Sequence, residues 1–214
     1  MKAILLSVAI AFASFATNAQ TMKELVNGSE HKVTWLGIDY SHVKMIGDFN
    51  QFAEAGASGP QLVKDKYFPA WNELIIKEYK KYDLQGALRK DTVYFKVGAI
   101  NKINAAAPIE SMEAEEEPNY TTEDIKSFVK DYNYNVTEGF GVLLVCEYMN
   151  KTTQKAKFHL LIFNLSTKEI IHTEAFTGVA GGFGLKNYWA KPYFEVIDQI
   201  KSKRFKAWKK EFGV

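Results

Sequence analysis

Apolar and polar residues follow a pattern along the chain that predicts five strands. In residues 31–39, Val33, Trp35 and Gly37 alternate with Thr34, Leu36 and Ile38, which predicts a strand that could continue through residues 43–46. Residues 91–103 also alternate between two faces, which predicts a second strand. Residues 139–149 form a nearly continuous apolar run, which indicates a central strand covered on both faces. Short polar turns connect this run to residues 157–163 and 169–177. These last three strands together predict an antiparallel meander.

Apolar residues at spacings of three and four predict helices between the strands. The first helix covers residues 68–82, and Pro69 suits its first turn because the missing N–H would have no partner there. A short helix is expected over residues 121–131, with a threonine as its N-cap. A long helix over residues 187–212, bent near Pro192, is expected to end the domain.

The predicted elements follow one another in the order β-α-β-α-β-β-β-α. We therefore expect an α+β fold of α/β type, with a single mixed sheet that contains an antiparallel three-strand meander and carries packed helices. Residues 21–30 are polar and predict only a loosely held lead-in. No repeat or low-complexity linker interrupts the chain, so residues 21–214 are expected to form one domain.

Residues 1–20 have the pattern of a secretory signal peptide. Lys2 supplies a positive charge, residues 4–15 are mostly apolar, and small residues at 16–19 resemble a cleavage site. The apolar run is shorter than the ~20 residues that a membrane-spanning helix needs. We therefore expect an exported protein, periplasmic or extracellular, with no transmembrane segment.

Composition narrows the class of protein further. Apolar residues make up 47% of the chain, enough for a sizeable core without disulfides, and Cys146 is the only cysteine. Because no cysteine stands directly after the leader, where a lipid would be attached, the protein is not expected to be a lipoprotein. The net charge of +2 lacks the strong basic excess that is typical of nucleic-acid binding, so no nucleic-acid partner is expected.

One family resemblance rests on the last third of the chain. The strand ends and turn of residues 163–170, the glycine-rich residues 178–184 and the terminal helix resemble the envelope α/β domain of the TolB amino-terminal, LpoB and CsgG type. The resemblance implies an accessory module that binds other proteins, and it offers no catalytic residue. LpoB-like and CsgG-like proteins are lipoproteins, and this chain lacks their lipidation cysteine.

The glycine-rich connection is the first candidate binding site. It lies between a predicted strand and a predicted helix, where backbone N–H groups can hold an anion. The candidate ligand-binding residues are Gly181, Gly182, Gly184 and Lys186. Their spacing matches neither common nucleotide-binding glycine motif. The alternative is that the glycines allow a tight turn and close packing of the helix on the sheet.

The carboxyl end of the first strand carries an acid, a hydroxyl and an imidazole, namely Asp39, Ser41 and His42. A hydrolase triad needs such groups to converge. Neighbouring side chains on an extended strand point to opposite faces, so we expect these three side chains not to converge into a triad. Whether the protein is an enzyme stays open, with a non-enzyme favoured.

A metal site is a weaker possibility. His159 and His172 lie on neighbouring predicted strands and could bind zinc with Glu147 or Glu174. No pair of potential ligands has the close spacing of a zinc motif, so neither a metal nor a cofactor is expected.

The terminal helix is the candidate partner-binding element. Its basic residues alternate with aromatic ones, and we single out Trp208, Lys209 and Lys210. Such a helix could dock on an acidic partner or contact a membrane surface. The alternative buries the apolar side on the sheet and leaves the lysines in water.

These patterns together favour an exported, non-catalytic accessory domain that acts through protein or cell-envelope contacts. The alternative is a small-ligand-binding protein, or an unrecognised hydrolase, with a pocket near residues 178–184.

Overall fold

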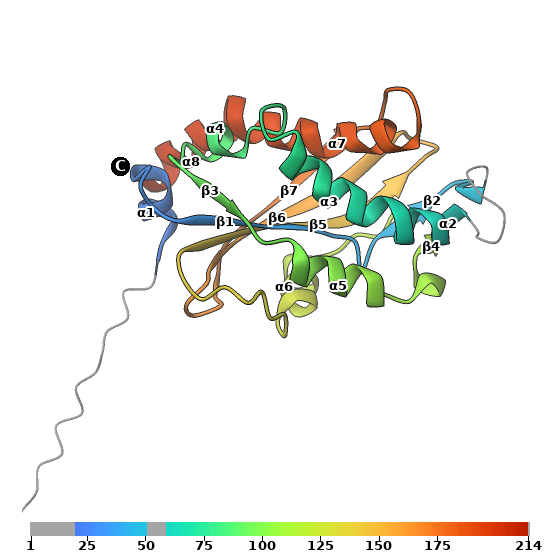
Figure 1. Cartoon of the computed structure of the whole chain (residues 1–214), viewed down its shortest axis with the longest axis horizontal. Coiled ribbons are helices and arrows are strands. Elements are labelled where there is room, and N and C mark those ends of the chain that lie inside the picture. The colour runs from blue at the N-terminus through green and yellow to red at the C-terminus, as the bar shows by residue number, and fades with distance from the viewer. Residues whose placement is uncertain (1–19, 51–58, 214) are drawn as a thin grey trace, which may run out of the picture.

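The computed structural model describes residues 20–50 and 59–213, which form a sheet with helices on both faces (Figure 1). The predicted leader, residues 1–20, lies outside the described residues except for Gln20. The strands are β1 (Val33–Asp39), β2 (Lys44–Ile46), β3 (Val93–Phe95), β4 (Glu113–Ala114), β5 (Phe140–Asn150), β6 (Lys155–Asn164) and β7 (Ile170–Val179).

The sheet is mostly parallel. Five strands pair side by side in the order β3-β1-β5-β2-β4, and all four of these pairings are parallel. β1 pairs with residues 140–145 of β5 and β2 with residues 148–150, so both lie along one edge of this longest strand. β6 pairs antiparallel along the opposite edge of β5, and β7 pairs antiparallel with β6. β7 therefore ends the sheet, because no strand of residues 20–50 or 59–213 lies beside its second edge.

The predicted architecture is wrong. We expected the order β-α-β-α-β-β-β-α and a sheet built around an antiparallel three-strand meander, whereas the structure is an α+β fold with a mostly parallel, curled sheet. β2 and β4 have only three and two residues, too few to show a period of two. The predicted strand over residues 91–103 contains β3 and most of a helix, α5 (Gly98–Ala106).

The other helices are α1 (Met22–Asn27), α2 (Gly59–Leu62), α3 (Phe68–Lys77), α4 (Leu84–Leu88), α6 (Thr122–Val129), α7 (Leu185–Gln199) and α8 (Phe205–Trp208). The predictions of helices near residues 68–82 and 121–131 are confirmed by α3 and α6. The polar lead-in contains α1, which Thr21 caps, so the expectation for residues 21–30 is wrong.

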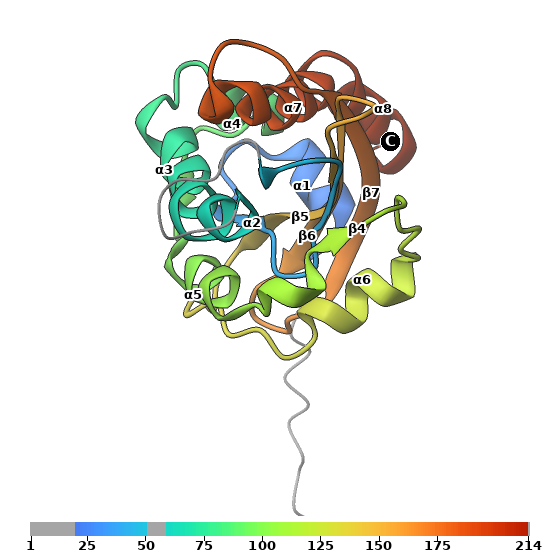
Figure 2. The ribbon, with the colours of Figure 1, turned by 90° about the vertical axis from the view of Figure 1, so that its right-hand side faces the viewer.

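Two apolar cores lie on opposite faces of the sheet (Figure 2). The larger one packs α3, α4, α7 and α8 on the sheet and contains Trp71 and Trp189. The smaller one lies under α5 and α6 and contains Ile100, Ile125 and Leu143. α3, α4, α7 and α8 therefore cover one face of the sheet, whereas α5 and α6 cover the other.

A bulge in β1 decides which of its residues face each core. The register against β5 shifts between Trp35 and Gly37, and Gly37 has a positive φ of 120°. Ile38 therefore joins Trp35 in the larger core, whereas Leu36 belongs to the smaller one. The simple alternation expected for this strand ends at the bulge.

Candidate functional site

The outer edge of β7 is an open strand edge in the described part of the chain. Two side chains of α7 cover its carboxyl end: Val179 N donates to Glu195 Oε2 at 2.7 Å, and Gln199 Nε2 donates to Thr177 O at 3.0 Å. These contacts show that the backbone groups of residues 177 and 179 point away from β6.

Thr173 and Ala175 have the same orientation, because outward-pointing residues alternate along an antiparallel strand. They pair by register with Leu161 and His159 of β6. Within residues 20–50 and 59–213, no hydrogen bond reaches their outward backbone groups. Figure 2 shows β7 along the side of the molecule, between α8 and α6. The edge can therefore accept another strand.

A basic groove adjoins the amino end of this edge. Lys126, Lys130 and Lys168 line it together with Glu169 and with Ile170 and Ile171 of β7. Lys126 is paired with Glu123 at 2.8 Å, whereas Lys130 and Lys168 have no ion pair among the described residues. We did not predict this groove, because α6 and the β6–β7 turn are about 40 residues apart in the chain and only the sheet brings them together.

The glycine-rich connection between β7 and α7 is a tight turn. Gly181 N donates to Tyr188 O at 3.0 Å, and Tyr188 N donates to Gly184 O at 2.9 Å. Gly182 and Gly184 have positive φ values of 106° and 78°, which glycine adopts most easily. The turn geometry thus supplies a structural reason for these glycines.

The predicted ligand residues of this connection are only partly together. Gly181 and Gly182 line a shallow hollow with Tyr82 and Lys191, but Gly184 and Lys186 are not among its lining residues. The carbonyl oxygen of Lys186 accepts the indole N–H of Trp71 at 2.9 Å, and its side chain is exposed. An anion site at this connection stays a prediction.

The predicted partner-binding residues separate into a buried and an exposed group. Trp208 is fully buried, and its indole Nε1 donates to Glu174 Oε2 at 2.8 Å. Arg204 pairs with the other oxygen of the same carboxylate at 2.5 Å. Lys209 and Lys210 are exposed. Trp208 therefore serves the core, and only the lysines remain accessible to a partner.

The residues at the end of β1 do come together, contrary to our expectation. Asp39 Oδ1 accepts from Ser41 N at 2.8 Å, and Ser41 Oγ lies 2.9 Å from His42 Nδ1. The hydroxyl of Tyr132 donates to Asp39 Oδ2 at 2.9 Å and lies 3.1 Å from Ser41 Oγ. The strand ends at Asp39 and the chain turns, so side chains that would diverge on a strand converge here.

The contacts of this cluster differ from those of a catalytic triad. A triad acid holds the imidazole, whereas Asp39 binds Tyr132 and the backbone of Ser41. The ring of His42 stacks on Phe128 at 3.8 Å, and burial lowers the pKa of His42 although Asp39 opposes this. For Tyr132, whose charged form is the deprotonated one, burial instead raises the pKa, so the hydroxyl keeps its proton. The network joins the α6 layer to the end of β1.

The histidines considered for zinc lie in separate pairs. His159 Nε2 is 2.5 Å from Glu147 Oε2, and His172 Nε2 is 3.5 Å from Glu174 Oε2. Lys157 also contacts Glu147, at 2.9 Å. Burial opposes ionisation of Glu147, but the hydrogen bonds of His159 and Lys157 outweigh it and lower the pKa of this carboxyl. The described residues contain no group of three potential ligands that could hold a metal ion.

Comparisons with known proteins give no family for this chain. No protein-family model matches it, and no curated protein is similar to it. Among residues 20–50 and 59–213, no helix combines the length and the apolar character needed to cross a membrane.

Proposed function

We propose that the protein is an exported, non-catalytic accessory domain that binds an envelope protein through the open edge of β7. The supporting observation is the pair of outward backbone positions at Thr173 and Ala175, whose outward N–H and C=O groups make no hydrogen bond with any described residue. An extended segment of a partner would add to the sheet there by main-chain hydrogen bonds. Export rests on the predicted leader, and the accessory role on the resemblance to the TolB, LpoB and CsgG type.

Charge indicates the kind of segment that fits. Lys130 and Lys168 lie at the amino end of the edge and form no ion pair with a described residue, although Glu169 lines the same groove. Lysines near a strand edge discourage pairing with a second copy of the same chain, and they attract an acidic segment. The apolar side chains of Ile170 and Ile171 supply contact area beside them. The proposed partner segment is therefore extended, acidic and partly apolar.

The experiment compares backbone variants of one position. Ala175→Pro removes an outward N–H without removing a hydrogen bond to β6, whereas the matched control Ala175→Ser keeps that N–H. A photo-crosslinking residue placed at Thr177 in native cells reports the partner. We expect one reproducible adduct in the wild type and the serine variant, and its loss in the proline variant.

Folding measurements and further variants accompany this test. Circular dichroism and thermal melting confirm that Ala175→Pro is folded, and Thr173→Pro repeats the test at the second position. The charge reversals Lys130→Glu and Lys168→Glu should weaken the adduct, whereas Lys80→Glu at an exposed position in the turn after α3 should not. An undiminished adduct in both folded proline variants would overturn the proposal.

A further inference from the structure

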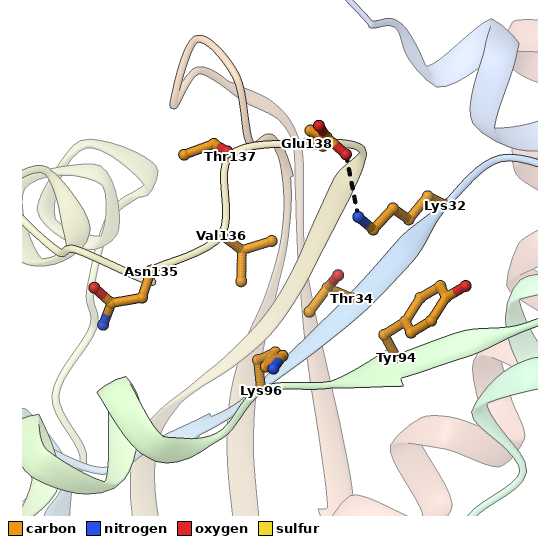
Figure 3. A pocket seen from close by; sticks show the side chains of 8 residues that line it. All are labelled: Lys32, Thr34, Tyr94, Lys96, Asn135, Val136, Thr137 and Glu138. Atoms are coloured by element: carbon orange, nitrogen blue, oxygen red, sulfur yellow. Dashed lines mark hydrogen bonds and ion pairs between the residues drawn. The ribbon is translucent and has the colours of Figure 1, made fainter.

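A polar pocket opens at the amino ends of β1 and β3, away from the edge of β7. Its volume is about 430 Å³ (Figure 3). Eight residues line it: Lys32, Thr34, Tyr94, Lys96, Asn135, Val136, Thr137 and Glu138. None of them belongs to a site predicted from the sequence.

Three segments that are distant in the chain build the pocket. Thr34 of β1 and Tyr94 of β3 are partners in the parallel register, so their side chains share one face of the sheet. Lys96 follows β3 and is held by its backbone N–H, which donates to Trp35 O at 2.9 Å. The loop before β5 forms the opposite wall, and Lys32 Nζ reaches Glu138 across the opening at 3.3 Å. The pocket thus has fixed walls on both sides.

The floor of the pocket holds a polar group without a partner. Thr34 is only 1% exposed, lines the pocket and makes no side-chain hydrogen bond with any residue in the described part of the chain. Figure 3 shows Thr34 among Lys96, Tyr94 and Val136, with its hydroxyl oxygen on the side of Lys32 and Glu138.

The charges around this hydroxyl are unbalanced. Glu138 neutralises Lys32, but Lys96 has no ion pair among the described residues. An ammonium group and a hydroxyl on one floor form a donor pair for an oxyanion. The ring of Tyr94 is 49% exposed beside them, and Val136 adds an apolar contact.

We propose that this pocket binds a small organic oxyanion, a carboxylate or a phosphate monoester attached to an apolar group. The anionic oxygens contact Lys96 Nζ and the hydroxyl of Thr34, and the apolar group packs against Tyr94 and Val136. This site is independent of the β7 edge, so the two proposals succeed or fail separately.

The test is calorimetric titration of the purified protein with benzoate, phenyl phosphate and the uncharged control benzyl alcohol. We expect binding of at least one anion, weakened by salt, and none of the alcohol. The ratio of the two affinities distinguishes a carboxylate from a phosphate ligand. Binding of neither anion at millimolar concentration would overturn the proposal.

Variants locate the binding. Lys96→Met keeps the side-chain stem and removes the charge, so affinity should fall about tenfold, the loss of one charge-assisted hydrogen bond. Thr34→Val keeps the shape and removes the hydroxyl, and it should weaken binding severalfold without loss of thermal stability. The control Lys102→Met changes an exposed lysine of α5 outside the pocket and should bind as the wild type does. Unchanged affinity in Lys96→Met would place any binding elsewhere.

Discussion

At the scale of single residues, side-chain amides replace a missing strand. β3 accompanies β1 only as far as the register pair Trp35 and Phe95. Beyond it, Ile38 N donates to Asn72 Oδ1 at 2.6 Å, and Tyr40 N donates to Asn104 Oδ1 at 2.7 Å. Both asparagine amides also donate to Ile38 O. The buried edge of β1 is therefore satisfied by helices rather than by a strand.

We expect Asn72→Ala to lower the free energy of unfolding by about 1–3 kcal/mol, because it leaves a buried backbone N–H of β1 without a partner. Urea denaturation followed by circular dichroism measures the change. The neighbouring variant Glu73→Ala removes an exposed ion pair and should cost less than about 1 kcal/mol. Equal losses in the two variants would contradict this explanation.

At the scale of elements, local capping decides where α6 begins. The hydroxyl of Thr121 accepts from Asp124 N at 3.2 Å, and Asp124 Oδ2 accepts from Thr121 N at 2.8 Å, which completes a capping box. The sequence predicted a threonine cap at Thr121 or Thr122, because a hydroxyl at this position accepts from the first turn, and the structure places the cap at Thr121. α6 in turn supplies Lys126, and its C-cap residue Lys130, to the basic groove.

Thr121→Ala should lower the free energy of unfolding by about 1 kcal/mol, since the first turn loses its side-chain acceptor. Chemical denaturation gives this number, and hydrogen exchange of the α6 amides shows whether the loss is local. Ser127→Ala on the same helix removes only an exposed bond to Asp124 O and serves as the control. A larger effect at Ser127 than at Thr121 would refute the capping argument.

At the scale of the whole molecule, burial of histidines in two different layers makes stability depend on pH. Burial lowers the pKa of His42 under α6, and it lowers the pKa of His172 beside Trp208 although Glu174 opposes the shift. The unfolded chain then binds protons at a higher pH than the folded protein does. Stability should therefore rise with pH up to the ordinary histidine value of about 6.5 and level off above it.

Thermal melting at a series of pH values between about 5 and 8 tests this dependence. His42→Gln and His172→Gln should each flatten the rise of melting temperature below pH ~6.5, and the double variant should flatten it most. Above that pH the three variants and the wild type should run parallel. A wild-type melting temperature that falls as pH rises from 5 to 6.5 would contradict the assigned pKa directions.

By itself, the sequence determined those features that depend on neighbours along the chain. A threonine cap of α6 (Thr121 or Thr122), Pro69 in the first turn of α3 and the apolar run of β5 were predicted because caps and periodic burial act over a few residues. The candidate residues were predicted less well, since Trp208 is buried and Lys186 lies outside the hollow that contains Gly181.

Only the tertiary structure decided how distant segments meet. β2 is a strand because its backbone pairs with β5, and β4 is a strand because its backbone pairs with β2, rather than because of a local residue pattern. The register shift at Gly37 depends on the pairing of β1 with β5. It also depends on the Asn72 side chain, whose Oδ1 would lie 3.1 Å from a Cβ atom on residue 37. The alternation within one strand therefore could not reveal the shift. The pocket around Thr34 and the basic groove beside β7 likewise join residues from separate segments, and strand pairing, rather than sequence proximity, sets their geometry.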